Sequence, residues 1–176
     1  MSKNTLVIYK SKTGFTERYA KWIAGELFCD MIPYGERKKI CFDQYGTVVY
    51  GGAFYAGSIN GIKWFKEKIP ELNGKTLIVF VTGAMQENVP EIEESMKRNF
   101  TEEERQKVKL FYMQAGLCYE KMGITDKILM AGLKKMLKKS GENEMYKQIE
   151  KSFDCAEKEK INSLVQYCRD NMACVK

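Results

Sequence analysis

The sequence contains no histidine, the side chain that most often acts as a general base in enzymes. Hydrolases in which a histidine activates a serine or a cysteine are therefore excluded. The six cysteines include no Cys-x-x-Cys pair, and without histidine they form no zinc-binding pattern. We expect free thiols and no metal site. No residue stands out as catalytic, so any chemistry must be supplied by a cofactor.

Long apolar runs are also missing. The longest, residues 77–81 and 48–50, fall far short of the roughly 20 residues that a membrane-spanning helix needs. Residues 1–4 lead directly into a strand, which predicts a cytoplasmic protein without a leader peptide. The 176 residues, 44% of them apolar, suffice for one buried core, and no repeat or linker interrupts them. We therefore expect a single domain over residues 1–176.

Acidic residues are in the minority: 23 aspartates and glutamates stand against 29 lysines and arginines, a net charge of +6. A basic surface favours acidic partner proteins or anionic lipid. Nucleic acid is not expected as a partner, because the basic residues are interleaved with acidic ones and no recognition motif accompanies them. A lysine-rich composition without any specific partner explains the charge equally well.

The most informative feature that is present lies at residues 7–17, where an apolar strand runs into a polar loop and then a helix. Ser11, Thr13 and Thr16 supply hydroxyl groups, and Gly14 lets the backbone approach a ligand closely. The first turn of the helix offers unpaired N–H groups and a partial positive charge of roughly +0.5. This pattern predicts a phosphate site; the alternative is an ordinary helix start capped by threonine. A Walker loop and a dinucleotide fingerprint both need more glycines than are present.

Strand and helix signals alternate along the chain, which is typical of a parallel sheet covered by helices on both faces. Apolar residues at 20, 23, 24 and 27 predict one buried helical stripe, and those at 161, 164, 165 and 168 predict another. Pro90 predicts the start of a helix with Asn88 as its cap. The expected strands cover residues 5–9, 29–34, 47–51, 76–81 and 110–115.

Two further loops follow the third and fourth expected strands. The first, residues 52–58, sets Phe54 and Tyr55 among small residues, which suits stacking on a flat ring. The alternative is a surface loop whose aromatic side chains cover the edge of the sheet. The second loop covers residues 82–88. Because the carboxyl ends of parallel strands meet at one edge of a sheet, we expect both loops to lie near the phosphate loop.

The start of the chain resembles the opening signature of flavodoxins at Val7, Ile8, Tyr9, Ser11, Gly14, Thr16, Ala20 and Ile23. The resemblance implies an α/β fold, a flavodoxin-like three-layer sandwich with a five-stranded parallel sheet in the order 2-1-3-4-5. Flavodoxin is itself a standard example of ligand binding where such a strand order reverses. The resemblance also implies flavin mononucleotide (FMN) as a non-covalent cofactor for electron transfer. The implied FMN-binding residues are Ser11, Lys12, Thr13, Gly14, Phe15 and Thr16 at the phosphate, Ala53, Phe54, Tyr55, Ala56 and Gly57 on one side of the flavin ring, and Thr82, Gly83, Ala84 and Asn88 on the other.

An insertion follows the fifth expected strand, at about residues 120–145. Within residues 126–140, Leu129, Leu133, Met136 and Leu137 have helical spacing, and lysines dominate the other positions, which predicts a basic amphipathic helix. One interpretation is a helix packed on the core with a solvated lysine face. The other is peripheral docking to an anionic membrane, or to an acidic redox partner, through Lys134, Lys135, Lys138 and Lys139.

The insertion, with residues 114–119 and 138–141, makes the chain similar to the flavodoxin-domain branch that includes menaquinone-dependent protoporphyrinogen oxidase. The sequence is compatible with three alternative functions. The first is an FMN-dependent electron carrier with a redox partner protein. The second is an oxidase that passes electrons from a porphyrinogen to a quinone. The third is an interaction module that keeps the fold without flavin.

Overall fold

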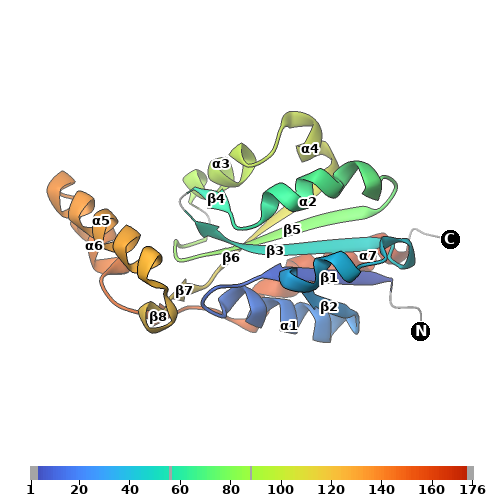
Figure 1. Cartoon of the computed structure of the whole chain (residues 1–176), viewed down its shortest axis with the longest axis horizontal. Helices are drawn as coiled ribbons and strands as arrows, with labels where there is room; N and C mark the ends of the chain where they lie inside the picture. Colours follow the sequence, from blue (N-terminus) through green and yellow to red (C-terminus); the bar gives the residue numbers. More distant parts are fainter. Residues whose placement is uncertain (1–3, 56, 88, 174–176) are drawn as a thin grey trace.

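The computed structural model describes residues 4–55, 57–87 and 89–173 (Figure 1). Its main sheet contains five parallel strands and one short antiparallel strand. A two-stranded sheet lies beyond its edge. The strands are β1 (Thr5–Lys10), β2 (Asp30–Pro33), β3 (Thr47–Tyr55), β4 (Ser58–Ile59), β5 (Thr76–Gly83), β6 (Val108–Gln114), β7 (Gly116–Leu117) and β8 (Phe153–Asp154). The α-helices are α1 (Phe15–Leu27), α2 (Ile62–Lys68), α3 (Pro90–Arg98), α4 (Glu102–Lys107), α5 (Ile124–Ser140), α6 (Asn143–Ile149) and α7 (Asn162–Ala173).

The parallel strands follow the spatial order β2-β1-β3-β5-β6, which is the predicted order 2-1-3-4-5 once β4 is left out of the count. At the centre of the sheet, Val7 of β1 pairs with Met31 of β2 and with Val49 of β3. Leu6, Val7 and Ile8 are fully buried, as expected for a strand covered on both faces. The predicted flavodoxin-like α/β fold is confirmed.

Helices cover both faces of the sheet, with α2, α3 and α4 on one side and α1 and α7 on the other (Figure 1). The first face buries Phe65 of α2 against strand residues such as Tyr50 and Val79. The second buries Ile23 of α1 against residues such as Phe80. The three layers therefore come from alternate side chains of the same strands pointing to opposite faces.

The two predicted helical stripes lie in the core. In α1, Ala20 and Ile23 are fully buried, and Ala24 and Leu27 pack against the same cluster. The second stripe begins in a short 3-10 helix at Ile161 and continues into α7 with Leu164, Val165 and Cys168. Burial raises the pKa of the Cys168 thiol to about 12, so this cysteine acts as a small apolar core residue.

Several element boundaries differ from the sequence prediction. β3 continues to Tyr55, so half of the expected loop at 52–58 is strand, and β4 returns antiparallel to it. β5 and β6 end at Gly83 and Gln114. Pro90 is the first residue of α3 as predicted, but the N-cap residue is Val89 and not Asn88. Pairing with a neighbouring strand outweighs the weak strand propensity of the Gly-Gly-Ala run in β3.

The segment after β6 forms an arm, which we define as residues 116–154. It begins at β7, continues through α5 and α6, and returns at β8 to pair with β7. The arm stands off one end of the sheet, the end at which the parallel strands finish (Figure 1). Gly116 is needed at its base, because a Cβ there would lie 2.1 Å from the carbonyl oxygen of Phe153. In the described ranges no helix has the length and apolar character needed to cross a bilayer.

Candidate functional site

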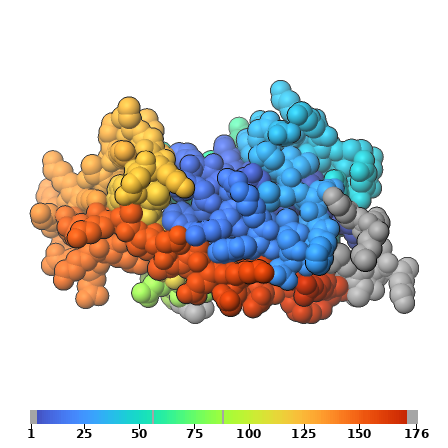
Figure 2. Space-filling view, turned by 90° about the horizontal axis from the view of Figure 1, so that it is seen from below, coloured from blue at the N-terminus to red at the C-terminus, as the bar shows by residue number. Residues whose placement is uncertain are grey.

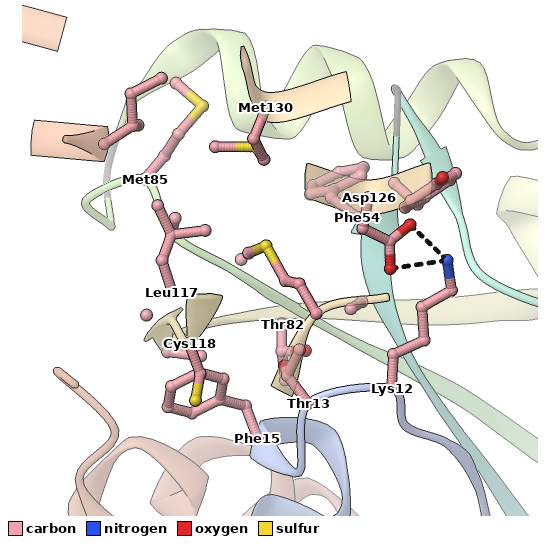
Figure 3. Close-up of a pocket in the computed structure, with 18 of the residues that line it drawn as sticks. Lys12, Thr13, Phe15, Phe54, Thr82, Met85, Leu117, Cys118, Asp126 and Met130 are labelled. Carbon is pink, nitrogen blue, oxygen red and sulfur yellow. Dashed lines mark hydrogen bonds and ion pairs between the residues drawn. The ribbon is translucent and has the colours of Figure 1, made fainter. Parts of the chain in front are cut away.

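A cavity of about 610 Å³ lies between the carboxyl ends of the strands and the arm. Its volume is in the usual range for small-molecule sites. The sheet side mixes polar side chains such as Thr13 and Thr82 with apolar ones such as Phe54, and the arm side is mostly apolar. In Figure 3, Thr13, Thr82 and Phe15 lie across the cavity from Met85 and Met130. The arm contributes Gly116, Leu117, Cys118, Met122, Asp126, Leu129, Met130, Leu133, Met145, Gln148 and Ile149.

The loop between β1 and α1 has a fixed shape. The Gly14 N–H donates a hydrogen bond to the Ser11 hydroxyl oxygen at 3.1 Å, which closes the loop. Gly14 is the N-cap residue of α1 with φ 97°, a conformation that glycine adopts without strain. The loop therefore presents the first turn of α1, with its N–H groups, to the space beside it.

Two lysines lie beside this loop. The Lys12 ammonium donates to Asp126 of α5 at 3.0 and 3.3 Å and lies 3.7 Å from the ring centre of Tyr55 (Figure 3). Hydrogen bonds from Lys12 and Tyr55 hold the pKa of Asp126 below its usual range. Lys121, from the arm, brings its ammonium to 3.6 Å from where a Cβ of Gly14 would be. Among the described residues, Lys121 has no ion pair, so its charge is not compensated as that of Lys12 is.

Two buried threonines join the phosphate loop to the end of β5. The hydroxyls of Thr16 and Thr82 are 2.8 Å apart, and both side chains are only 1% exposed. One hydroxyl donates to the other, so one hydrogen of the pair is left to donate elsewhere. Because both residues line the cavity, the free hydroxyl hydrogen is available to a ligand there.

The β3–β4 hairpin supplies the side of the cavity that the sequence predicted as a loop. Phe54 pairs with Ile59, and the Asn60 N–H donates to the Ala53 carbonyl at 2.9 Å. Gly52 makes this close pairing possible, since a Cβ there would meet the Asn60 carbonyl oxygen at 2.7 Å. The Phe54 ring lines the cavity, whereas Tyr55 is engaged with Lys12 and Asp126.

The segment after β5 is tied to β6 by a tyrosine. The Tyr112 hydroxyl donates to the Met85 carbonyl at 2.8 Å, and burial raises the pKa of Tyr112, so it stays a neutral donor. Gly83 is required beneath it, because a Cβ there would lie 2.6 Å from the Tyr112 hydroxyl oxygen. This contact fixes the backbone of residues 83–85 along one wall of the cavity.

The base of the arm is tied to α1 by Arg18, which donates to Asp154 at 2.7 and 2.8 Å, and further contacts hold the arm together internally. Tyr119 donates to the Ile149 carbonyl at 2.6 Å, and the Lys134 ammonium lies 4.2 Å from the Tyr119 ring centre. Lys134 also donates to the Glu150 carbonyl at 2.8 Å. Near the cavity, the arm reaches the sheet side through Asp126 and through a 3.5 Å contact from Gln148 to the Ala84 carbonyl.

The residues predicted from the sequence gather at this cavity with few exceptions. Ser11 and Gly14 shape the phosphate loop without lining the cavity, and Gly57 lies at the tip of the hairpin, away from it. Ala56 and Asn88 lie outside the described residues. Those that line the cavity are Lys12, Thr13, Phe15, Thr16, Ala53, Phe54, Tyr55, Thr82, Gly83 and Ala84.

Sequence reasoning missed the arm's contribution to the site. Asp126, Lys121 and the apolar lining of α5 lie more than a hundred residues from the phosphate loop in the sequence. The helical spacing of Leu129 and Leu133 is a signal of a buried face, but it does not say what that face covers. Met130, on the same face, was not singled out, although it lines the cavity.

The chain is similar to several proteins of known structure. Among solved structures, a WrbA-like flavodoxin from Agrobacterium tumefaciens is 20% identical, with a TM-score of 0.40 over 49% of this chain and 63% of its own. The Trp repressor binding protein from Bacillus subtilis is 12% identical, with a TM-score of 0.47 over 62% of this chain and 83% of its own. A flavodoxin from the domain Archaea is 16% identical, with a TM-score of 0.38 over 62% of this chain and 82% of its own.

These identities and TM-scores are too low to say anything about the ligand of this chain. No curated protein matches its sequence. The family model described as "Flavodoxin domain" matches residues 6–144, from the first strand of the sheet to the arm. Since that match spans most of the 176 residues, the chain belongs to the flavodoxin domain family.

Proposed function

We propose that the protein binds FMN non-covalently and transfers electrons through it. The observation that carries this proposal is the convergence of three separate strand ends on one cavity, beside the loop that opens α1. Bound FMN supplies the redox chemistry, because its ring accepts and releases electrons. The chain's own residues hold and orient the cofactor.

The residues at the phosphate loop fit a phosphate group. The first-turn N–H groups of α1 have no acceptor within the helix, and a helix N-terminus favours an anion. The left-handed Gly14 keeps the loop open to close approach, and Lys121 adds an uncompensated positive charge above it. Together these features support a phosphate ester bound at this end of the cavity.

The rest of the sheet-side wall fits a flat ring. Phe54 offers an aromatic face, and its ring centre is 6.3 Å from that of Tyr112. On the other side, residues 83–85 form a backbone wall fixed by the Tyr112 hydrogen bond. Small residues at Ala53, Gly83 and Ala84 let main-chain groups approach the ring edge.

The first test is flavin binding itself. Purified protein is examined for a bound-flavin absorbance spectrum, any released cofactor is identified by mass, and the apoprotein is titrated with FMN and with riboflavin. We expect FMN to bind more tightly than riboflavin, because riboflavin has the same ring and lacks the phosphate. Equal affinities would contradict the role of the phosphate loop. If the protein binds neither flavin, the flavin-free interaction module is the hypothesis that remains.

A second candidate function is favoured by the apolar half of the cavity. Leu117, Met130 and Leu133 form a wall that FMN's polar side chain does not need. Such a wall suits an apolar substrate or acceptor, as in the oxidase that passes electrons from a porphyrinogen to a quinone. The test is turnover of protoporphyrinogen by flavin-loaded protein with a menaquinone analogue. No turnover, together with intact flavin binding, would leave the electron carrier with a redox partner protein.

A further inference from the structure

The large apolar side chains exposed on this protein are concentrated in one region. Within the described residues, eight are exposed, and seven of them lie on the arm or at the rim of the cavity. The exception is Phe28, at the far end of α1. Exposed apolar residues scattered singly need no explanation, but a group on one face marks an interaction site. The seven are Tyr55, Met85, Ile124, Ile128, Leu129, Met136 and Met145.

The outer surface of α5 is the centre of this group. Ile124 is 80% exposed, Ile128 is 66% exposed and Met136 is 60% exposed. Ile124 and Ile128 lie outside the predicted stripe, whereas Met136 belongs to it; within that stripe Leu137 is buried and Leu133 lines the cavity. The helix therefore has two apolar sides, one toward the cavity and one toward solvent. The space-filling view shows the arm, in yellow and orange, at one end of the molecule, where α5 is free to meet another surface (Figure 2).

Lysines flank the exposed apolar side chains. The exposed lysines of α5 are Lys127, Lys135, Lys138 and Lys139, whereas Lys134 is turned toward Tyr119 and Glu150. The helix has one acidic residue, Asp126, and it is paired with Lys12. The solvent side of α5 thus combines apolar side chains with lysines, which are most frequent in its last turns, and the helix has no free carboxylate.

We propose that α5 docks on an anionic lipid bilayer, with Ile124 and Ile128 in the interface and Lys135 and Lys139 at the headgroups. An interfacial helix combines an apolar face with lysines in this way, and negatively charged lipids attract the cations. A second copy of the chain is a poorer occupant. A two-fold symmetric contact would pair this surface with itself, and since it carries four exposed lysines and no free carboxylate, their charges would stay uncompensated. The inference rests on the exposed surface alone and does not require the proposed flavin function.

The apolar surface is continuous with the cavity. Leu129, Met85 and Met145 are each exposed and also line the cavity. A docked α5 would therefore place the mouth of the cavity against the lipid. An apolar ligand dissolved in the bilayer would reach the site without crossing water.

The test is flotation of the full-length protein with vesicles. One set contains phosphatidylcholine and phosphatidylglycerol, and the other contains phosphatidylcholine alone, each at low and at high salt. We expect binding to the anionic vesicles at low salt and weaker binding at high salt, because salt screens exposed charges. The double variant Ile124→Ser/Ile128→Ser and the double variant Lys135→Glu/Lys139→Glu should each lose at least tenfold in partitioning.

The matched control is Phe28→Ser, which removes an aromatic side chain that is 84% exposed at the opposite end of the molecule. This variant should bind vesicles as the native chain does. Flavin binding and circular dichroism of every variant establish that the fold is intact. Failure of the native protein to float with anionic vesicles would overturn the proposal. So would equal binding by the native chain and the isoleucine variant, or a concentration-dependent dimer that this variant abolishes.

Discussion

The two walls of the cavity are built differently. On the sheet side, the lining residues lie in α1, in the ends of buried strands or in the loops that follow them, and α1 buries five of its 13 residues. On the arm side, α5 has 17 residues, and Leu137 is the one that is buried. The sheet side is fixed by hydrogen bonds between neighbouring elements, such as the one between Thr16 and Thr82. The arm side is held at its base, where Arg18 of α1 pairs with Asp154, and at the Lys12–Asp126 pair.

Because of this difference, the two walls of the cavity suit different ligands. A wall of short hydrogen bonds and buried strand ends suits a ligand of one fixed shape, such as the phosphate of a cofactor. A wall of flexible side chains on a lightly anchored arm suits ligands of varied shape, because methionine adapts to irregular surfaces. Elements with few buried contacts are also those that open most easily. We therefore expect changes on the sheet side to affect cofactor affinity and changes on the arm to affect access and the second ligand.

The largest expected effect belongs to Thr16, on the sheet side. Replacing Thr16 by Val removes a hydroxyl in contact with Thr82 and should weaken FMN binding by about 1–3 kcal/mol, because a buried polar partner is left unsatisfied. Riboflavin affinity should change less, since it lacks the phosphate. Titration by flavin fluorescence checks this, with the exposed Thr125→Val of α5 as the control. Equal losses for both flavins would mean that Thr16 acts on the ring or on folding.

On the arm side, Leu133 provides the matching test. Replacing Leu133 by Ala should weaken binding of a quinone analogue such as menadione by about 1–2 kcal/mol. This loss is smaller than for a fully buried leucine, because Leu133 is only half-buried. FMN affinity should be unchanged. The measurement is a pair of titrations, one of quinone against flavin-loaded protein and one of FMN against the apoprotein. A loss of FMN affinity alone would show that the arm wall serves the cofactor.

The sheet side could be predicted from the sequence because its signals are local. Residues 7–17 contain the strand, the loop and the helix start within one short segment. The alternation of elements predicts the parallel sheet, and the resemblance to flavodoxins implies its strand order. The β3–β4 hairpin was the main error on this side. Its Gly-Gly-Ala run, residues 51–53, looks like a loop, but it is strand because it pairs with β1 and β5.

The arm could not be predicted in the same way. Helical spacing identified α5, but Leu129 and Met136 of its predicted stripe are exposed. The exposure of Ile124 and Ile128 depends on how the arm stands relative to the sheet. The pairing of Lys12 with Asp126 joins residues 114 positions apart, and no local pattern indicates it. Lys134 is one of the lysines that the sequence suggested for docking, but in the structure its ammonium lies against the Tyr119 ring.

Lys121 joins the two sides, since an arm residue lies over the loop of the sheet side. Replacing Lys121 by Met should reduce FMN affinity by about 0.2–1 kcal/mol, as for other exposed charge contacts. Riboflavin affinity should stay the same, and the salt dependence of FMN binding should decrease. Lys135→Met, on the same arm but away from the loop, is the control. An unchanged FMN affinity at low salt would remove Lys121 from the site.

The smallest expected effect concerns the Lys12–Asp126 pair, which closes the arm on the sheet side. Replacing Asp126 by Asn should lower the free energy that holds the arm against the sheet side by about a few tenths of a kcal/mol. The effect is small because Lys12 is 44% exposed and water screens the pair. The expected readout is faster hydrogen exchange in residues 124–140, with Asp170→Asn on α7 as the control. Equal protection in native protein and variant at neutral pH would mean that this pair does not hold the arm.

The pH dependence follows from the same carboxylate. Its pKa is lower in the folded protein than in the unfolded chain, so the stabilisation is fully present above the ordinary aspartate pKa of about 4 and is lost as the pH falls through the lowered pKa. The extra protection of the native arm over Asp126→Asn should therefore disappear in acid. Comparing the two proteins at each pH removes the intrinsic pH dependence of exchange. A protection difference that persists in acid would assign arm closure to apolar contacts, such as those of Leu133, rather than to charge.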